Sequence, residues 1–381
     1  MKSIRTLFLL ILVAILTVGC REESVVYPPE PNPVDDPSPI FEEIQGFYLL
    51  NEGNMGSNKS TLDRYIYADG IYTRNIYSEV NPDVPKELGD VGNDLKIYGS
   101  RLYAVINCSN KIEVMDAATA RRIGQIDIPN CRYIEFNGAY AYVTSYAGPV
   151  EIRPDYSQKG YVAKVDTVTL QVVDRCIVGF QPDELAILDG KIYVANSGGY
   201  MVPNYENTVS VIDLERFVEE RRIEIAINLH RIRPDSKGRL WITSRGDYYD
   251  KDARLFCFNP KTDQIEKTFD VPVSQMDISG DSIYVVSASW SYETMSNTIT
   301  NAIIDTRMME KVSDNFIKDG TETQIKIPYG VKVNPLTGQI FVTDAGNYVN
   351  PGWLYCFSRE GLLQWRVRTG DIPAHFAFFG K

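Results

Sequence analysis

Aromatic, amide and guanidinium side chains gather in the segments between predicted β-strands, where they would form a binding surface. These candidate ligand-binding residues are Asn54, Tyr146, Arg153, Tyr156, Tyr200, Tyr205, Arg245, Tyr248, Tyr249, Trp290, Tyr292 and Tyr348. Tyrosine offers a large rigid surface with a polar tip at a low cost in conformational entropy, as in antibody binding loops. We therefore predict a ligand-binding face. The alternative for any single ring is that it fills a gap between neighbouring sheets.

The two arginines of this set have two interpretations. Arg153 and Arg245 would bind an anionic or amide-rich ligand, or they would pair with the nearby carboxylates Asp155 and Asp247. The sequence leaves both alternatives open.

A second set of polar residues begins a series of short apolar strands. Its members hold comparable places in successive repeats and are Asp94, Tyr133, Glu184, His230, Gln275, Tyr329 and His375. We predict a polar ring of mixed charge at the centre of the fold, with Asp94, Tyr133, Tyr329 and His375 available to a ligand. The alternative is a central channel that holds ordered water.

Motifs for catalysis are absent or weak. The chain has only two histidines, in NLHRI and IPAHF, which excludes an HExxH zinc site, and it has neither GxSxG nor a P-loop. Asp247, Asp250 and Asp252 are spaced loosely like a calcium loop but lack its Gly and distant Glu. We predict a binding protein, not an enzyme, with no catalytic residues, catalytic cofactor or metal site.

The elements that must position these residues follow one pattern, written about seven times. An aliphatic-aromatic second strand follows a short turn, and it occurs at 46–51, 101–105, 139–144, 191–196, 239–244, 282–287 and 339–344. A third strand ending near Asp occurs at 111–116, 161–166, 208–213, 254–259, 300–305 and 353–358. Four-stranded units at a spacing of roughly 40–50 residues are typical of a β-propeller. We predict an all-β fold, a seven-bladed β-propeller with four-stranded blades.

The two ends of the repeat region are incomplete in complementary ways. GFYLLN (46–51) is a second strand with no first strand before it, and AHFAFFG (374–380) is a first strand with no second strand after it. Because an open sheet edge is a liability, we predict that the C-terminal strand joins the first blade and closes the ring. One stretch, LERFVEERR (214–222), has a helical pattern, and we expect a short helical insertion there.

The loops of the two propeller faces differ in length. Connections between second and third strands run up to SYAGPVEIRPDYSQKG (145–160), whereas turns on the opposite face are as short as LDGK and SGDS. Loops on a rigid scaffold carry binding, so the candidate residues should share the elaborated face.

The N-terminus indicates export. Residues 1–20 combine Lys2 and Arg5 with an apolar run and end in LTVGC, which resembles a bacterial lipobox with Cys20 as the lipidated residue. The acidic residues after Cys20 resemble the surface-export signal of Bacteroidetes lipoproteins; the alternative is a lipoprotein that faces the periplasm. Residues 21–40 form a Pro-rich tether. We predict that residues 41–381 form the propeller and that the protein is anchored in the outer membrane and exposed at the cell surface.

The net charge limits the classes of partner, and the cysteines limit the kinds of covalent or metal site, that the protein can have. The net charge of −11 argues against nucleic acid and anionic lipid. Cys108 and Cys131 should lie near the same rim of neighbouring blades, which makes them a candidate disulfide, whereas Cys257 and Cys356 alternate with aromatics as buried thiols do. No CxxC pair is present, which argues against a zinc or redox site.

The repeat also carries a family resemblance. NTVSVIDLE, preceded by KIYVANSGG, resembles the YVTN or YncE-type surface propellers over nearly all of the mature chain. The lipobox, acidic signal, Pro tether and NEGNMGSN opening together resemble the BtuG-type surface lipoproteins of Bacteroides. That resemblance implies capture of cobalamin (vitamin B12) and related corrinoids and their delivery to a BtuB-like TonB-dependent outer-membrane transporter. It implies no individual contact residues.

Cobalamin is a flat apolar corrin fringed by amides, so a mouth of Tyr, Trp, Asn and Arg would stack on it and form hydrogen bonds with it. Two other functions stay open. One is a glycan-binding or adhesive surface propeller, because aromatic faces also stack on sugars. The other is a lactonase-like hydrolase, which would need an acidic metal site with contributions from Asp94 and Glu184.

Overall fold

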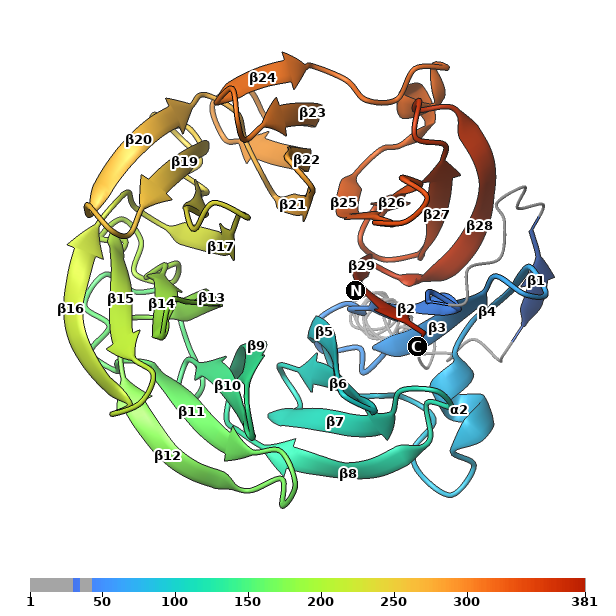
Figure 1. The fold of residues 1–381 in the computed structure, drawn as a ribbon, viewed down its shortest axis with the longest axis horizontal. Helices are drawn as coiled ribbons and strands as arrows, with labels where there is room; N and C mark the ends of the chain where they lie inside the picture. The colour runs from blue at the N-terminus through green and yellow to red at the C-terminus, as the bar shows by residue number, and fades with distance from the viewer. Residues whose placement is uncertain (1–29, 35–42, 381) are drawn as a thin grey trace, which may run out of the picture.

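The described residues form a ring of sheets around a central axis. The computed structural model describes residues 30–34 and 43–380, and Figure 1 shows their sheets arranged like the blades of a propeller. There are seven antiparallel sheets, six with four strands and one with five. This arrangement confirms the predicted seven-bladed, all-β propeller.

Each blade runs outward from the axis through four strands. The innermost strands are β5 (Gly92–Tyr98), β9 (Cys131–Asn137), β13 (Pro182–Leu188), β17 (Leu229–Pro234), β21 (Gln275–Ser279), β25 (Pro328–Val333) and β29 (Pro373–Phe379). The second strands are β2 (Gly46–Asn51), β6 (Arg101–Ile106), β10 (Tyr140–Ser145), β14 (Lys191–Asn196), β18 (Leu240–Ser244), β22 (Ser282–Ser291) and β26 (Ile340–Asp344).

The third strands are β3 (Thr61–Ile66), β7 (Lys111–Asp116), β11 (Tyr161–Asp166), β15 (Thr208–Asp213), β19 (Arg254–Asn259), β23 (Ser296–Asp305) and β27 (Pro351–Phe357). The outer strands are β4 (Ile71–Thr73), β8 (Arg122–Asp127), β12 (Val172–Ile177), β16 (Val218–Glu224), β20 (Gln264–Phe269), β24 (Glu310–Ser313) and β28 (Leu363–Asp371).

The C-terminal strand closes the ring as predicted. β29 pairs antiparallel with β2, in a register that runs from Gly46 opposite Phe379 to Asn51 opposite Pro373. The first blade therefore takes its innermost strand from one end of the chain and its other strands from the opposite end, so the inner edge of β2 is paired.

Part of the predicted tether lies against the ring. β1 (Pro31–Pro33) pairs with β4 as a fifth strand of the first blade, and the Val34 amide donates to the Gly70 carbonyl at 2.9 Å. The extended backbone that Pro favours fits an outer edge of this kind. The predicted signal segment 1–20, with Cys20, and the rest of the tether lie outside the described residues.

The predicted helical insertion is wrong. Residues 214–217 form a turn, in which the Phe217 amide donates to the Asp213 carbonyl at 2.9 Å, and β16 follows directly. Pairing with the open edge of β15 outweighs the helical propensity of the Glu- and Arg-rich stretch. Among the described residues the helices are elsewhere and short: α2 (Ile76–Val80) and a 3₁₀ turn η1 (Thr321–Gln324). No helix within the described ranges is long and apolar enough to cross a membrane.

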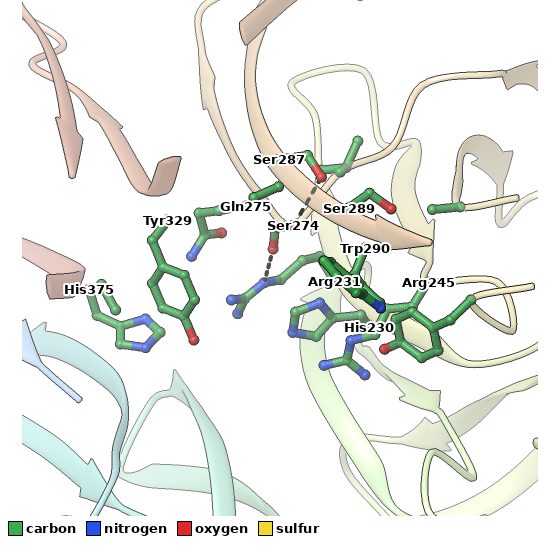
Figure 2. Close-up of a pocket in the computed structure, with 15 residues that line it drawn as sticks. His230, Arg231, Arg245, Ser274, Gln275, Ser287, Ser289, Trp290, Tyr329 and His375 are labelled. Carbon is green, nitrogen blue, oxygen red and sulfur yellow. Dashed lines mark hydrogen bonds between the residues drawn. The ribbon is translucent and has the colours of Figure 1, made fainter. Parts of the chain in front are cut away.

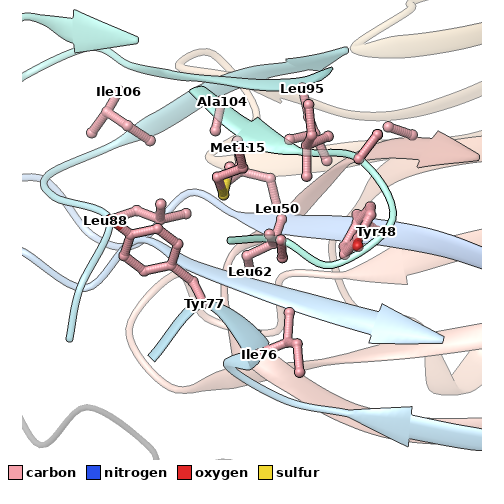
Figure 3. Packing of buried hydrophobic residues seen from close by; sticks show 14 residues of the cluster. Tyr48, Leu50, Leu62, Ile76, Tyr77, Leu88, Leu95, Ala104, Ile106 and Met115 are labelled. Carbon is pink, nitrogen blue, oxygen red and sulfur yellow. The ribbon is translucent and has the colours of Figure 1, made fainter. Parts of the chain in front are cut away.

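The core consists of seven apolar clusters, each between two adjacent blades. Successive strand residues face opposite sides of a sheet, so both sides of a blade supply apolar residues to its neighbours. Figure 3 shows the cluster between the first two blades, where Tyr48 and Leu50 of β2 pack with Leu95 of β5. The seam that closes the ring is aromatic, with the Phe47 and Phe341 rings 4.9 Å apart. This packing makes a rigid frame for the loops.

Candidate functional site

The innermost strands begin on the same face of the ring that carries the long second-to-third-strand loops, and a cavity opens there. This inner cavity has a volume of about 240 Å³ and receives residues from the last three blades and from β29. Its polar lining includes His230, Arg231, Arg245, Gln275, Tyr329 and His375 (Figure 2). Among the described residues that line it, none is Asp or Glu.

An outer cavity continues the inner one toward the rim of the face. It measures about 210 Å³ and shares Arg245, Tyr248 and Trp290 with the inner cavity. Its far wall carries the charged residues Asp252 and Asp270. The two cavities form one mouth, which has a cationic inner part and a mixed outer part.

The ends of the innermost strands are shaped by β-bulges. The register of β9 with β10, and of β17 with β18, shifts near the mouth. Buried threonines of the second strands supply the missing partners: the Tyr133 amide donates to Thr144 Oγ1 at 3.1 Å, and the Arg231 amide to Thr243 Oγ1 at 2.8 Å. Bulges re-aim side chains, and these two turn Tyr133 and Arg231 toward the axis.

A buried charge cluster stands behind the cavity. Asp183, which is 0% exposed, accepts a hydrogen bond from the Tyr146 hydroxyl at 2.6 Å. It also pairs with Arg245 at 2.8 Å and with Arg132 at 3.4 Å. Burial and the adjacent carboxylate raise the pKa of Tyr146 well above its usual value, so the hydroxyl stays protonated. One carboxylate therefore holds two guanidinium groups and a tyrosine in place.

A second carboxylate, Glu184, anchors the next pair of arginines. It lies 2.9 Å from Arg233 and 3.6 Å from Arg231. Burial opposes ionisation, but these two guanidinium groups lower the pKa of Glu184 below its usual value. Glu184 also accepts the Ile232 amide at 2.8 Å, which joins two blades.

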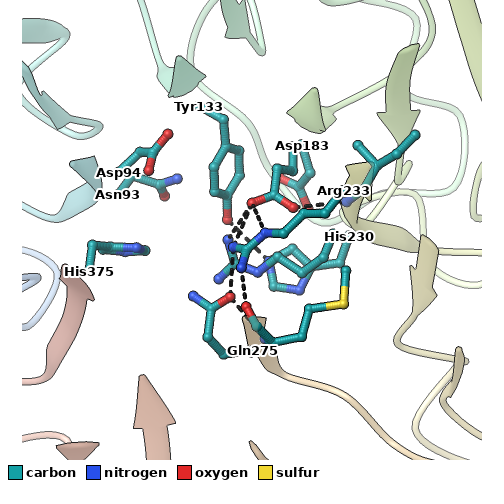
Figure 4. Close-up of polar contacts among 12 residues, drawn as sticks. Asn93, Asp94, Tyr133, Asp183, His230, Arg233, Gln275 and His375 are labelled. Atoms are coloured by element: carbon teal, nitrogen blue, oxygen red, sulfur yellow. Dashed lines mark hydrogen bonds and ion pairs between the residues drawn. The ribbon is translucent and has the colours of Figure 1, made fainter. Parts of the chain in front are cut away.

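His230 is neutral and has one unpaired nitrogen. Its side chain is 8% exposed, and its Nε2 lies 3.1 Å from the Tyr133 hydroxyl (Figure 4). Its Nδ1 has no hydrogen-bond partner. Burial and the guanidinium groups of Arg245 and Arg231 hold the pKa of His230 well below its usual value. A residue that lines the cavity thus carries a buried nitrogen without a partner.

The opposite wall is organised by Glu52. Its two carboxylate oxygens lie 2.8 Å from the Tyr329 hydroxyl and 3.0 Å from His375 Nε2. Burial, with the Glu52 charge beside it, raises the pKa of Tyr329 well above its usual value. The NEGN segment after β2 therefore fixes two of the predicted central residues.

An aromatic rim, defined here as Tyr248, Tyr249, Trp290 and Tyr292, borders the outer cavity. The Tyr249 and Tyr292 rings stack with centroids 5.1 Å apart, and the Trp290 ring meets Tyr292 edge-on at 6.2 Å. The Tyr292 amide donates to the Tyr248 carbonyl at 3.1 Å, which ties the 245–253 loop to the long β22–β23 hairpin. Tyr249 is 57% exposed and Tyr292 is 51% exposed, so their faces are available to a ligand.

Other predicted aromatics support the mouth from neighbouring loops. Tyr200 meets Tyr146 edge-on at 6.3 Å, and Tyr348 meets Tyr329 edge-on at 5.9 Å. Asn54 donates to the Tyr348 carbonyl at 2.7 Å. Burial, with the neighbouring Tyr248, raises the pKa of Tyr205 above its usual value.

Three predicted residues neither line the mouth cavities nor contact the side chains that line them. Arg153 pairs with Glu151 at 3.0 Å and with Asp155 at 3.7 Å, so the ion-pair alternative describes it. Tyr156 is buried and donates to the Pro149 carbonyl at 2.9 Å, within its own loop. Asp94 accepts the Ile134 amide at 3.1 Å and lines the far half of the channel.

Arg245 follows neither of the two alternatives completely. It reaches the inner cavity, and its ion-pair partner is Asp183 instead of Asp247. Asp247 accepts the amides of Tyr249 and Lys251, at 3.0 and 2.9 Å, and so shapes its own loop. Within the part of the chain that the structure describes, no group of three or more His, Cys, Asp or Glu residues could hold a metal ion.

The predicted disulfide is not formed in the structure. Cys108 and Cys131 are both free thiols, the first exposed and the second buried. Cys131 points into the core between two blades, where its Sγ lies 3.4 Å from the Lys111 carbonyl. Burial raises the pKa of Cys131 to about 12.

Sequence reasoning missed several residues that build the mouth. Asp183 and Glu52 hold predicted residues in place, while Arg132 and Arg231 add positive charge. A signal was present for Arg231, because Thr243 within WITS (241–244) accepts the Arg231 amide at the bulge that turns it inward. The sequence carries no such signal for Asp183, since its partners Tyr146 and Arg245 lie 37 and 62 residues away along the chain.

Comparisons with known proteins agree with this architecture. The solved structures that are similar, at low identity, include the following two. One is a quinonprotein alcohol dehydrogenase-like protein from Bacteroides thetaiotaomicron, with a TM-score of 0.59, 15% identity, and coverage of 88% of this chain and 78% of that chain. The other is hydrazine synthase of Kuenenia stuttgartiensis, with a TM-score of 0.56, 16% identity, and coverage of 74% and 88%. Identities this low support a shared propeller fold and nothing finer.

No curated protein sequence matches the chain. One family profile, described as a domain of unknown function (DUF5074), matches residues 45–368, which is nearly the whole ring. The chain therefore belongs to the DUF5074 family.

Proposed function

We propose that this protein captures cobalamin and related corrinoids at the mouth of the propeller and delivers them to a TonB-dependent outer-membrane transporter. The observation that carries the proposal is the joining of an exposed aromatic rim to a polar, hydrogen-bonding cavity on the loop-rich face. A corrin is a broad apolar disc with amides at its edge, so it needs both surfaces in one site.

The cavities match parts of such a ligand. The rings of Tyr249, Trp290 and Tyr292 would pack on the corrin, while Gln275 would bind amide oxygens. The rim is held by backbone pairing and the inner wall by buried ion pairs, so little ordering is required on binding. In the proposed setting, lipidated Cys20 and the Pro-rich tether hold the ring at the outer membrane above the transporter.

A titration of the purified protein with cyanocobalamin tests the proposal. We expect submicromolar affinity by calorimetry and co-elution of the red ligand from a desalting column. Tyr249→Ala should weaken binding about five- to thirtyfold, because aromatic anchors contribute about 1–2 kcal/mol. Tyr98→Ala is the matched control: Tyr98 is 36% exposed at a turn of the opposite face, so its loss should leave affinity unchanged.

A glycan-binding function is the second candidate, favoured by the exposed stacked pair of Tyr249 and Tyr292. It predicts retardation in polysaccharide affinity gels and loss of that retardation in Tyr249→Ala. Absence of heat and of co-elution with cyanocobalamin, combined with such retardation, would replace cobalamin capture by glycan binding.

A further inference from the structure

The inner cavity has an unusual balance of charge for an acidic protein. The chain has a net charge of −11. Yet the charged groups on the described wall of this cavity are Arg231 and Arg245, with the imidazoles of His230 and His375 beside them. Its other polar groups include the serine hydroxyls of Ser274, Ser287 and Ser289, the amide of Gln275 and the hydroxyl of Tyr329. The wall therefore presents hydrogen-bond donors and no carboxylate.

The carboxylates behind the wall do not neutralise its guanidinium groups. Four arginines surround His230, namely Arg132, Arg231, Arg233 and Arg245. Asp183 is shared by two of them and Glu184 by the other two. Arg231 has the weakest pairing, at 3.6 Å from Glu184, and its Nε makes a long 3.4 Å contact with the Ser274 carbonyl. Its guanidinium retains unused donors.

His230 supplies a second, independent observation. Its side chain is more than nine-tenths buried, lines the inner cavity and has an Nδ1 without a partner. The Tyr133 hydroxyl can donate to Nε2, which leaves the ring hydrogen on Nδ1. A buried donor with no partner costs free energy, and a ligand acceptor at this position would remove that cost.

We propose that the inner cavity is an anion subsite, in which Arg231, Arg245 and His230 Nδ1 bind one singly charged oxyanion of the captured ligand. The subsite rests on the proposed capture of ligands at this mouth. A phosphodiester or a carboxylate would both satisfy its chemistry, since each offers oxygen acceptors to planar guanidinium groups. Cobalamin carries one phosphodiester in its nucleotide loop, and cobinamide lacks that loop.

The test compares Arg231→Gln with Arg153→Gln, an exposed arginine of the same face that lies outside the mouth cavities. Calorimetry with cyanocobalamin and with cobinamide separates the phosphodiester from the corrin. We expect Arg231→Gln to weaken cyanocobalamin binding about ten- to hundredfold, because a hydrogen bond to a charged group is lost, and to leave cobinamide affinity within threefold. Arg153→Gln should change neither. An equal loss for both corrinoids, or no loss, would overturn the subsite.

Simple anions test the subsite without a corrinoid. Phosphate and acetate, titrated at constant ionic strength, should raise the melting temperature of the wild type more than that of Arg231→Gln. A larger effect of phosphate indicates a phosphodiester ligand, and a larger effect of acetate indicates a carboxylate ligand. If neither corrinoid binds but this difference persists, cobalamin capture fails and the anion subsite stands. Identical responses of both proteins would overturn the subsite.

Discussion

The buried carboxylate of Asp183 offers the sharpest test of how the mouth is held together. Its Oδ1 accepts from Tyr146 and Arg132, and its Oδ2 accepts from Arg245. Asp183→Asn keeps the shape but removes the charge. It also places an amide N–H against one of these donors, whichever way the amide is turned.

The expected effect is large because the site is fully buried. Removing one partner of a buried ion pair costs about 3–5 kcal/mol. The unfolding entropy is about 2.1 cal/mol/K per residue, so a ring of roughly 340 residues loses about 1.4 °C per kcal/mol. Asp183→Asn should therefore lower the melting temperature by about 4–7 °C.

The assay is thermal unfolding followed by circular dichroism at a fixed scan rate. Asp263→Asn is the matched control, because Asp263 pairs with Arg221 at 3.0 Å on the exposed surface, with side chains 42% and 39% exposed. Surface pairs contribute at most about 1 kcal/mol, so this control should shift the melting temperature by less than about 1.5 °C. A melting temperature of Asp183→Asn equal to that of the control would refute the idea that Asp183 organises the mouth.

Three other predictions concern the ring, its thiols and its histidine. Deleting residues 374–381 should abolish cooperative unfolding, because it removes β29 and with it the contact of Phe376 with Phe47. Deletion of residues 30–34 is the control. A cooperative unfolding transition in the C-terminal deletion would contradict ring closure. At pH 8, peptide mapping after brief alkylation should find Cys108 modified and Cys131 unmodified, whereas a linked Cys108–Cys131 peptide would disprove the free thiols. Because the pKa of His230 is lowered in the folded protein, only the unfolded chain binds a proton at this residue just below about pH 6.5. As the pH falls, the free energy of unfolding of the wild type should therefore decrease by up to about 1.4 kcal/mol per pH unit more than that of His230→Gln. Parallel profiles of the two proteins in urea unfolding between pH 7.5 and 5 would contradict this prediction.

The fold could be predicted from the sequence because each blade repeats a local pattern. Strands such as KIYVAN (191–196) combine aliphatic and aromatic residues that fit between two neighbouring sheets, and the same need recurs in every blade. The incomplete patterns at 46–51 and 374–380 were sufficient to predict ring closure. The segment 214–222 was mispredicted because its helical propensity is local, whereas the strand edge that pairs with it is not.

The candidate site could be predicted only in outline. Exposed rim residues such as Tyr249 and Tyr292 follow from loop composition, because the connections between second and third strands all lie on one face of the ring. Asp183 could not be recognised, since it differs from an ordinary strand residue only through contacts with side chains from two other blades. The contacts of Tyr156 and Asp94 could not be predicted for the same reason: their hydrogen bonds, to a loop carbonyl and to a neighbouring strand, depend on backbone geometry that no local pattern encodes.

A crystal structure of the protein soaked or co-crystallised with cyanocobalamin tests the central claim most directly. The account predicts a corrin packed against Tyr249 and Trp290 at the mouth, with the phosphodiester within hydrogen-bond distance of Arg231 in the inner cavity. A corrin bound on the opposite face or at the outer strands, or a mouth without ligand at saturating concentration, would contradict it.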